Sequence, residues 1–286
     1  MTGTVALVGA GPGAADLLTL RAARLIAQAD WLIHDALVGG EVLALATRAR
    51  RYCVGKRAGR RSVPQARTNR LMIACAARGG LVVRLKGGDP MLFARASEEI
   101  AALRAAGVAF EIVPGITSAQ AAHAALTVPM TDRDTRRSVV LATPQVARGR
   151  EAGLEDTSWA RALANAGGGA VYMAASASAR IRALLLTMGM PASTPVSWVS
   201  DASLPSMRIE DGTLGTLSPP AAWRAGAATL LLVGTRAARR TDPLYSAQDE
   251  PPATPVCARD RSARPEPDSG RARAAHLAAG ALEGDP

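Results

Sequence analysis

The sequence predicts an α/β fold of two lobes followed by a C-terminal tail. Short apolar segments of β type alternate with segments whose apolar residues recur every three or four positions, which indicates strands and helices around a mostly parallel sheet. This alternation occupies residues 1–130 and again residues 131–240, with a break near Pro129–Asp134. Residues 241–286 hold seven of the eighteen prolines and mixed charges, which predicts a disordered tail. The default ligand site is a cleft between the two lobes.

The first lobe is expected to contain five strands, at Val5–Gly9, Trp31–His34, Tyr52–Val54, Leu81–Leu85 and Phe110–Val113. Helical periodicity covers Thr19–Ala29. A second helix is expected after Ser62, which would form a capping box with Gln65 around Pro64 in the first turn; Gly79 would end it. In the second lobe the expected elements are strands at Ser138–Thr143, Ala170–Met173, Pro195–Ser200 and Thr229–Val233, and helices near Ser158–Asn165 and Ser178–Met188.

Composition narrows the class of protein. Three scattered cysteines are too few for a disulfide framework or a cysteine-based zinc site, and no histidine pair has metal-ligand spacing, so we expect no metal. The N-terminal residues do not resemble a signal peptide, and no apolar run approaches the roughly 18–20 residues that cross a bilayer. These features favour a cytoplasmic protein without membrane contact.

The net charge of +10 raises nucleic acid as a partner. Against that partner, aromatic residues make up only 3% of the chain, and basic residues form no run longer than two. All but two of the 34 basic residues are arginines, the exceptions being Lys56 and Lys86. The charge suits any polyanionic partner, including a small molecule with several carboxylates, so we do not expect nucleic acid.

The segment Val5–Gly13 runs from a strand into a glycine-rich turn. Gly9, Gly11 and Ala14 satisfy the relaxed dinucleotide fingerprint, and Asp30 or Asp35 follows at the distance of a ribose-binding acid. An NAD(P) oxidoreductase is therefore one alternative, and a tight turn without a ligand is another. Pro12 argues against the first, because it removes an amide donor from the loop that would hold the pyrophosphate.

Two further turns follow strands, Leu85–Pro90 and Pro114–Ala119. Doubled glycines in the first let a ligand approach the backbone, and Asp89 can accept hydrogen bonds from a ribose or an ammonium group. Thr117 or Ser118 in the second could simply cap the next helix. Because carboxyl ends of parallel strands share one sheet edge, we expect all three turns to line one crevice.

Asp35 and Lys56 each follow a strand end. A lysine in a chain that otherwise uses arginine could mark the need for a movable, deprotonatable amine, although an exposed ion pair or two unrelated surface charges are an equal alternative. His34 is expected to be a partly buried strand residue, and His123 a member of an alanine-rich helix.

These segments together resemble a known family. V-G-A-G-P-G-x-x-D-L-L-T-L-R-A, D-A-L-V, V-G-K-R-A-G with S-V-P-Q, R-L-K-G-G-D-P and V-P-G-I-T-S, in this order and spacing, are similar to the uroporphyrinogen-III C-methyltransferases of the tetrapyrrole methylase superfamily. The resemblance covers roughly residues 3–236 and is weaker in the second lobe, at Val171–Met173 and Asp211–Leu217.

The resemblance implies a two-lobed tetrapyrrole methylase fold, usually a homodimer, that uses S-adenosylmethionine to methylate C2 and C7 of uroporphyrinogen III. The product would be precorrin-2, for sirohaem, cobalamin or haem d1. It implies Asp35 as proton acceptor and Lys56 as proton donor. Contacts to the methyl donor would come from Pro12, Gly87, Gly88, Asp89, Leu92, Thr117, Ser118, Met173 and Ala202. The eight carboxylates of the substrate suit arginines near the cleft, above all Arg57 and Arg84, and also Arg60, Arg61 and Arg95.

The sequence departs from the family pattern at three places in the second lobe: Asp132 replaces a histidine, Thr143–Gln145 replaces T-G-H, and Ala174 replaces a glycine. A methylase of a later corrin intermediate, or a degenerate paralogue, is therefore a further alternative.

Overall fold

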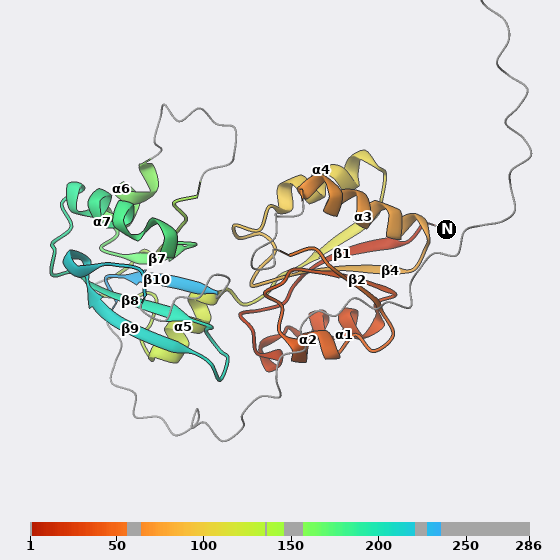
Figure 1. Ribbon diagram of the computed structural model, residues 1–286, viewed down its shortest axis with the longest axis horizontal. Helices are drawn as coiled ribbons and strands as arrows, with labels where there is room; N and C mark the ends of the chain where they lie inside the picture. Colours follow the sequence, from red (N-terminus) through yellow and green to blue (C-terminus); the bar gives the residue numbers. More distant parts are fainter. Residues whose placement is uncertain (1, 56–63, 135, 146–156, 221–227, 236–286) are drawn as a thin grey trace, which may run out of the picture. The chain divides into compact units, whose positions relative to one another are not determined.

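The computed structural model describes residues 2–55, 64–134, 136–145, 157–220 and 228–235 (Figure 1). Within them the predicted α/β class is confirmed, because helices accompany two five-stranded sheets. The predicted tail, 241–286, lies outside the described residues. None of the helices in these ranges is long and apolar enough to span a membrane.

The first sheet is parallel throughout. Its strands are β1 (Thr4–Gly9), β2 (Trp31–His34), β3 (Arg50–Cys53), β4 (Leu81–Lys86) and β5 (Phe110–Val113), in the order β3-β2-β4-β1-β5. Strands β4, β1 and β5 are neighbours, so the turns that leave their carboxyl ends start from the same edge. This order places the three predicted ligand turns side by side.

Helices cover both faces of the first sheet (Figure 1). They are α1 (Leu20–Gln28) and α2 (Gly40–Ala44) on one face, and α3 (Gln65–Ala77) and α4 (Ala96–Ala105) on the other. Alternate side chains of β1 point to opposite faces of the sheet. Val8 lies in one core with Ile26 of α1. Leu7 lies in the core on the other face, with Met72 of α3 and Leu103 of α4. A strand buried on both sides explains why β1 is continuously apolar.

The start of α3 corrects one prediction. Pro64 occupies the N-cap position rather than the first turn, and Ser62 lies outside the described residues. The side chain of Gln65 donates instead to Asn69 Oδ1 at 3.1 Å and to Glu99 Oε1 at 3.0 Å. Gly79 follows the helix in the left-handed region, at φ 85°, as expected of a stop residue.

The second sheet is mixed, and the expectation of a mostly parallel sheet is wrong for it. Its strands are β6 (Val140–Ala142), β7 (Gly169–Tyr172), β8 (Pro195–Ser200), β9 (Arg208–Thr213) and β10 (Thr229–Val233), in the order β6-β7-β10-β8-β9. Only β6 and β7 are parallel. A short connection joins β8 to β9, which allows antiparallel pairing without a crossover. Strand β9 was not predicted, because an edge strand rich in charged residues has no apolar alternation in its sequence.

Helix α5 (Ser118–Leu126) packs on the second sheet, although it directly follows the last strand of the first. Its Ala122 and Leu126 lie in one core with Leu230 and Leu232 of β10. Helices α6 (Ser158–Asn165) and α7 (Ser178–Thr187) pack in a separate core with Leu231 and Val233, the β10 residues that point to the opposite face of the sheet. The chain therefore passes from the first sheet to the second between Val113 and Ser118; the lobe boundary at residue 130 stays a prediction.

Candidate functional site

The three predicted turns meet, as the sequence suggested. Gly11 and Gly88 donate backbone hydrogen bonds to each other, with nitrogen-to-oxygen distances of 3.2 Å from Gly11 and 2.7 Å from Gly88. Gly115 N–H donates to Asp89 Oδ2 at 2.9 Å. A Cβ on Gly115 would lie 2.3 Å from the carbonyl oxygen of Gly88 and 2.9 Å from Cα of Gly9, so this packing requires glycine.

Next to this packed centre, the backbone of the Gly87–Gly88 turn is open. A Cβ added to Gly87 or to Gly88 would meet no atom within 4 Å. Gly88 also has a φ of 67°, a conformation that favours glycine. The glycines thus serve two purposes, close packing at Gly115 and free access to the backbone at Gly87 and Gly88.

Two residues of these turns have local structural partners. The Asp89 carboxylate accepts from Gly115 N–H and, through Oδ1, from Met91 N–H at 2.7 Å, so it ties two turns together. Thr117 is the N-cap of α5 and forms a capping box with Gln120, so it does cap the helix; its contact with a ligand stays a prediction. Ser118 is the first residue of α5.

The turn after β1 differs from a dinucleotide-binding turn. A short 3₁₀ segment, Ala15–Leu17, follows Pro12 and Gly13, and α1 begins only at Leu20 with Thr19 as its cap. In the dinucleotide fold the helix N-terminus itself faces the pyrophosphate. Here α1 starts too far along the chain to do so, and the geometry does not support the NAD(P) alternative.

Left-handed residues mark the ends of strands β7 and β8. Met173, half-exposed, has a φ of 55°, and Asp201 and Ser203 on either side of the buried Ala202 have φ of 51° and 75°. The Ser203 hydroxyl accepts a hydrogen bond from Ala14 N–H at 3.1 Å. Such strained backbone clusters at ligand sites. These contacts bring the neighbourhood of Ala202 to the turn that contains Pro12.

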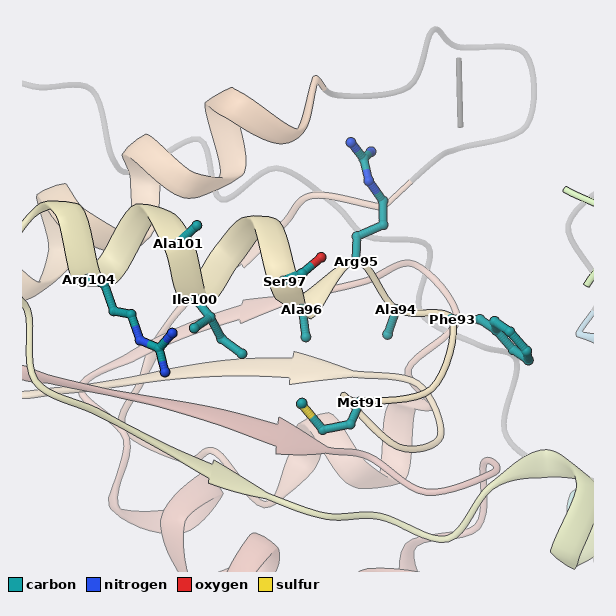
Figure 2. A pocket seen from close by; sticks show the side chains of 9 residues that line it. All are labelled: Met91, Phe93, Ala94, Arg95, Ala96, Ser97, Ile100, Ala101 and Arg104. Carbon is teal, nitrogen blue, oxygen red and sulfur yellow. The ribbon is translucent and has the colours of Figure 1, made fainter. Parts of the chain in front are cut away.

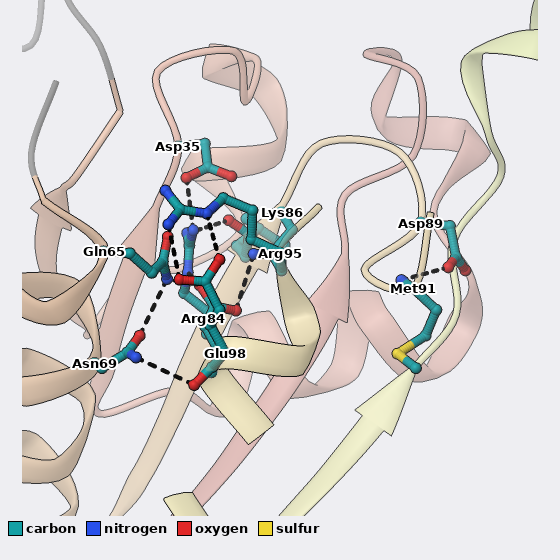
Figure 3. Close-up of polar contacts among 11 residues, drawn as sticks. Asp35, Gln65, Asn69, Arg84, Lys86, Asp89, Met91, Arg95 and Glu98 are labelled. Atoms are coloured by element: carbon teal, nitrogen blue, oxygen red, sulfur yellow. Dashed lines mark hydrogen bonds and ion pairs between the residues drawn. The ribbon is translucent and has the colours of Figure 1, made fainter. Parts of the chain in front are cut away.

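The Asp35 carboxylate is held by Arg84 (Figure 3). Its Oδ1 accepts from Arg84 Nη2 at 2.7 Å, and its side chain keeps 33% of its surface exposed. His34 is buried rather than partly buried as predicted, and its Nδ1 donates to the carbonyl of Asp35 at 2.9 Å. Burial lowers the pKa of His34, which keeps it neutral beside Arg84. Lys56 and Arg57, like Arg60 and Arg61, lie outside the described residues.

Arg84 is buried, with 4% of its side chain exposed. Its Nε donates to Glu99 Oε1 at 3.0 Å, and its Nη1 to the carbonyl of Leu85 at 3.1 Å. Burial disfavours the guanidinium charge, but the carboxylates of Asp35 and Glu99 outweigh it and raise the pKa of Arg84. These bonds hold the guanidinium within the protein, which suits a role in positioning Asp35; contact between Arg84 and the substrate stays a prediction.

Lys86 and Glu99 complete this cluster, and the sequence did not single out Glu99. Lys86 Nζ donates to Glu99 Oε2 at 2.9 Å, and both side chains are buried. Burial, together with the charge of Arg84, lowers the pKa of Lys86, while Glu99 partly offsets this. The rarity of lysine in the sequence was the one feature that drew attention to Lys86. No feature of the sequence distinguished Glu99 from the adjacent Glu98.

A separate pocket of about 540 Å³ lies along the first half of α4 (Figure 2). Its lining consists of Met91, Phe93, Ala94, Arg95, Ala96, Ser97, Ile100, Ala101 and Arg104. Arg95, which we expected near the substrate, pairs at its rim with Glu98 at 2.7 Å. Among the expected methyl-donor and proton-transfer residues that the structure describes, none lines this pocket, so it does not coincide with the predicted site.

The described residues contain no group of three or more histidine, cysteine, aspartate or glutamate side chains able to hold a metal ion. The remaining expected contact, Leu92, follows Asp89 in the same turn, with its N–H bonded to the carbonyl of Asp89 at 3.3 Å. The expected contacts to the methyl donor therefore lie on the turns after β1, β4, β5, β7 and β8 and at the start of α5. The hydrogen bonds given above link four of these turns, those after β1, β4, β5 and β8.

Comparison with known proteins gives consistent relatives. The chain is 43% identical to siroheme synthase 3 of Aeromonas hydrophila subsp. hydrophila over 234 residues, 82% of this chain and 49% of the relative. It therefore spans about half the length of the curated relatives it matches. A siroheme synthase of Edwardsiella ictaluri is 45% identical over 81% of this chain and 49% of its own.

Solved structures agree. A uroporphyrin-III C-methyl transferase from Thermus thermophilus, complexed with S-adenyl homocysteine, is 34% identical with a TM-score of 0.69, over 81% of this chain and 97% of that one. A cobalt precorrin-4 methyltransferase is 25% identical with a TM-score of 0.67, over 81% and 94% of the two chains. The model of the tetrapyrrole (corrin/porphyrin) methylases matches residues 4–218. The chain belongs to the tetrapyrrole (corrin/porphyrin) methylase family.

Proposed function

We propose that this protein is an S-adenosylmethionine-dependent C-methyltransferase that methylates uroporphyrinogen III at C2 and C7 to give precorrin-2. The observation that carries the proposal is the open Gly87–Gly88 backbone, at the edge where the three turns meet. Relatives named siroheme synthase and uroporphyrin-III C-methyl transferase support the substrate class. The proposal includes action in the cytoplasm as a homodimer, with sirohaem, cobalamin or haem d1 as the end product.

The residues present fit the methyl donor. Free space over Gly87 and Gly88 leaves their backbone accessible to a ligand, and the exposed Met173 can add an apolar contact. Remaining contacts are assigned to Pro12, Asp89, Leu92, Thr117, Ser118 and Ala202. Bound there, S-adenosylmethionine supplies a methyl group on a sulfonium, which a nucleophilic ring carbon can attack. The protein's share of the catalysis is to align the substrate with it and to exclude water.

Asp35 is assigned the proton transfer. Methylation of a pyrrole carbon leaves positive charge on the ring, which a nearby carboxylate can stabilise and then discharge by accepting a proton. Asp35 is the part of its ion-pair cluster that solvent reaches most, so it is the group a substrate would meet. Lys56 is assigned as proton donor and Arg57 as a partner for substrate carboxylates; Arg84 we assign to positioning Asp35.

Two of the three departures from the family pattern, Ala174 and Asp132, are accommodated without backbone strain. Ala174 has φ −79°, which any residue adopts, and its side chain is fully buried. Asp132 exchanges backbone hydrogen bonds with Arg136 and accepts from Asp134 N–H at 2.9 Å, so it builds a local turn. A methylase of a later corrin intermediate is the second candidate, favoured by the similarity to a cobalt precorrin-4 methyltransferase.

Incubation with S-adenosylmethionine and uroporphyrinogen III, followed by mass analysis, tests the proposal. Two added methyl groups are expected; one would reduce the assignment to a single methylation. No transfer to uroporphyrinogen III, with transfer to a methylated corrin intermediate, would establish the second candidate. Calorimetry with S-adenosylhomocysteine and with NAD(P)H gives an independent check, because binding of the nicotinamide alone would overturn the methylase assignment.

Asp35→Ala tests the assigned proton acceptor. It should abolish methyl transfer and leave the affinity for S-adenosylhomocysteine nearly intact, because the described partner of the Asp35 carboxylate is Arg84 rather than a residue of the three glycine turns. An unimpaired rate would remove Asp35 from the mechanism while leaving the methylase assignment standing.

A further inference from the structure

Behind Asp35 lies a glutamate without exposed surface. Both oxygens of Glu99 are occupied: Oε1 accepts from Arg84 Nε and from Gln65 Nε2, each at 3.0 Å, and Oε2 accepts from Lys86 Nζ at 2.9 Å. The donors come from α3 and β4, so Glu99 joins α4 to both. Only an ionised carboxylate can accept from three donors and offer none in return.

Glu99 fixes the orientation of Arg84. The guanidinium is planar, so anchoring Nε at Glu99 and Nη1 at the carbonyl of Leu85 determines where Nη2 points. Nη2 then donates to Asp35 Oδ1 at 2.7 Å. Without the Nε anchor, an arginine side chain regains rotamers that its burial had excluded.

The four charges balance inside the protein. Arg84 and Lys86 supply two positive charges, and Asp35 and Glu99 two negative ones. Three of the four side chains are at most 4% exposed, and the chain of contacts reaches solvent at Asp35, which is 33% exposed. Buried ion pairs add little net stability compared with apolar residues of similar volume. A cluster that ends at one accessible carboxylate is suited instead to holding that carboxylate in place.

We propose that Glu99 is a positioning residue for Asp35, which it orients through Arg84, and that Lys86 saturates the second oxygen of Glu99. The inference rests on the proposed function in one respect, the role of Asp35 as proton acceptor. Asp35 must meet the methylated ring at one position, and misplacement by about 1 Å can slow a reaction roughly 100-fold.

The test compares Glu99→Gln with Glu98→Gln. Both lie on α4 and undergo the same chemical change, but Glu98 is half-exposed and its carboxylate pairs with the exposed Arg95. Glutamine at position 99 keeps one oxygen and turns an NH₂ group toward either Arg84 or Lys86, so one donor faces another. We expect kcat to fall roughly 10- to 100-fold in Glu99→Gln, with KM for S-adenosylmethionine within about twofold, and no change in Glu98→Gln.

A second-site variant separates positioning from loss of fold. In Lys86→Met/Glu99→Gln the NH₂ group can face the methionine, and the oxygen can accept from Arg84 Nε. This double variant should recover most of the lost rate, measured at a temperature where every variant is folded. A rate for Glu99→Gln equal to that of Glu98→Gln would overturn the proposal. A double variant no faster than Glu99→Gln would overturn it too, and so would a parallel loss of S-adenosylhomocysteine affinity.

A spectroscopic measurement keeps this inference distinct from the proposed function. The Nε–H signal of Arg84, assigned by its loss in Arg84→Lys, should exchange slowly with solvent in the wild type and in Glu98→Gln, and faster in Glu99→Gln. If exchange changes in this way but Asp35→Ala still transfers methyl groups, the role of Asp35 fails while the orientation of Arg84 by Glu99 stands. Unchanged exchange in Glu99→Gln would refute the inference itself.

Discussion

Replacing Lys86 by methionine removes the ammonium group that faces Glu99 Oε2 at 2.9 Å and keeps a side chain of similar length. Glu99 has no exposed surface, so water cannot take the place of the lost donor. The buried network then carries two carboxylates for one guanidinium. Breaking a buried pair by removing one partner costs about 3–5 kcal/mol, because the remaining charge stays desolvated.

The same reasoning predicts a lower free energy of unfolding for Glu99→Gln, because the Lys86 ammonium is left without its carboxylate partner. The decrease should be smaller when both substitutions are combined. A charge-free pair of similar volume is close to neutral in such sites. At about 2–4 °C per kcal/mol for a fold of this size, each single variant should melt roughly 6–20 °C below the wild type. The double variant should be more stable than the sum of the single losses predicts.

Urea unfolding followed by circular dichroism measures these differences, with equal m-values as the check that the unfolded states match. Glu98→Gln is the control, because its partner Arg95 is exposed and surface pairs contribute about 0–1 kcal/mol. Additive losses in the double variant would refute the reasoning, since they would mean that Lys86 and Glu99 do not stabilise each other. So would a loss below about 1 kcal/mol in Lys86→Met.

Three further outcomes are expected. Burial should hold the pKa of Lys86 below the ordinary lysine value of 10.5, and Glu99→Gln should lower this pKa further. Because the chain has only two lysines, ¹³C-lysine labelling resolves the Lys86 titration. An unshifted titration in both proteins would contradict the burial argument. Because the unfolded chain binds more protons between the lowered pKa and 10.5, the penalty that burial of the charged Lys86 places on folding is full below the lowered pKa and is relieved as pH rises through that window. Gly87→Ala should leave Tm unchanged but weaken S-adenosylhomocysteine binding in calorimetry. Gly115→Ala should lower Tm, because its Cβ would lie 2.3 Å from the Gly88 carbonyl oxygen. Equal effects of the two variants on Tm would argue against an open backbone at Gly87. Thr117→Val should cost about 1 kcal/mol of stability through the lost cap, and a matching fall in S-adenosylhomocysteine affinity would indicate that the hydroxyl also binds the donor.

The sequence determined the local elements of this protein and the turns that surround the site. Strands such as Trp31–His34 and Pro195–Ser200 matched their predicted bounds, because periodicity and turn residues are properties of neighbouring positions. The meeting of the three glycine turns also followed from the sequence, since parallel strands must end at one edge. Strand β9 did not, because an edge strand with charged residues has no apolar pattern to detect.

Only the tertiary structure decided which charges meet. Asp35 lies 49 positions from Arg84 in the sequence, and Glu99 and Gln65 join the cluster from two different helices. Nothing in the sequence around Glu99 separates it from Glu98, yet the first is fully buried and the second half-exposed. Ion pairing depends on distance in space and on desolvation, and both are set when α3 and α4 pack against β4.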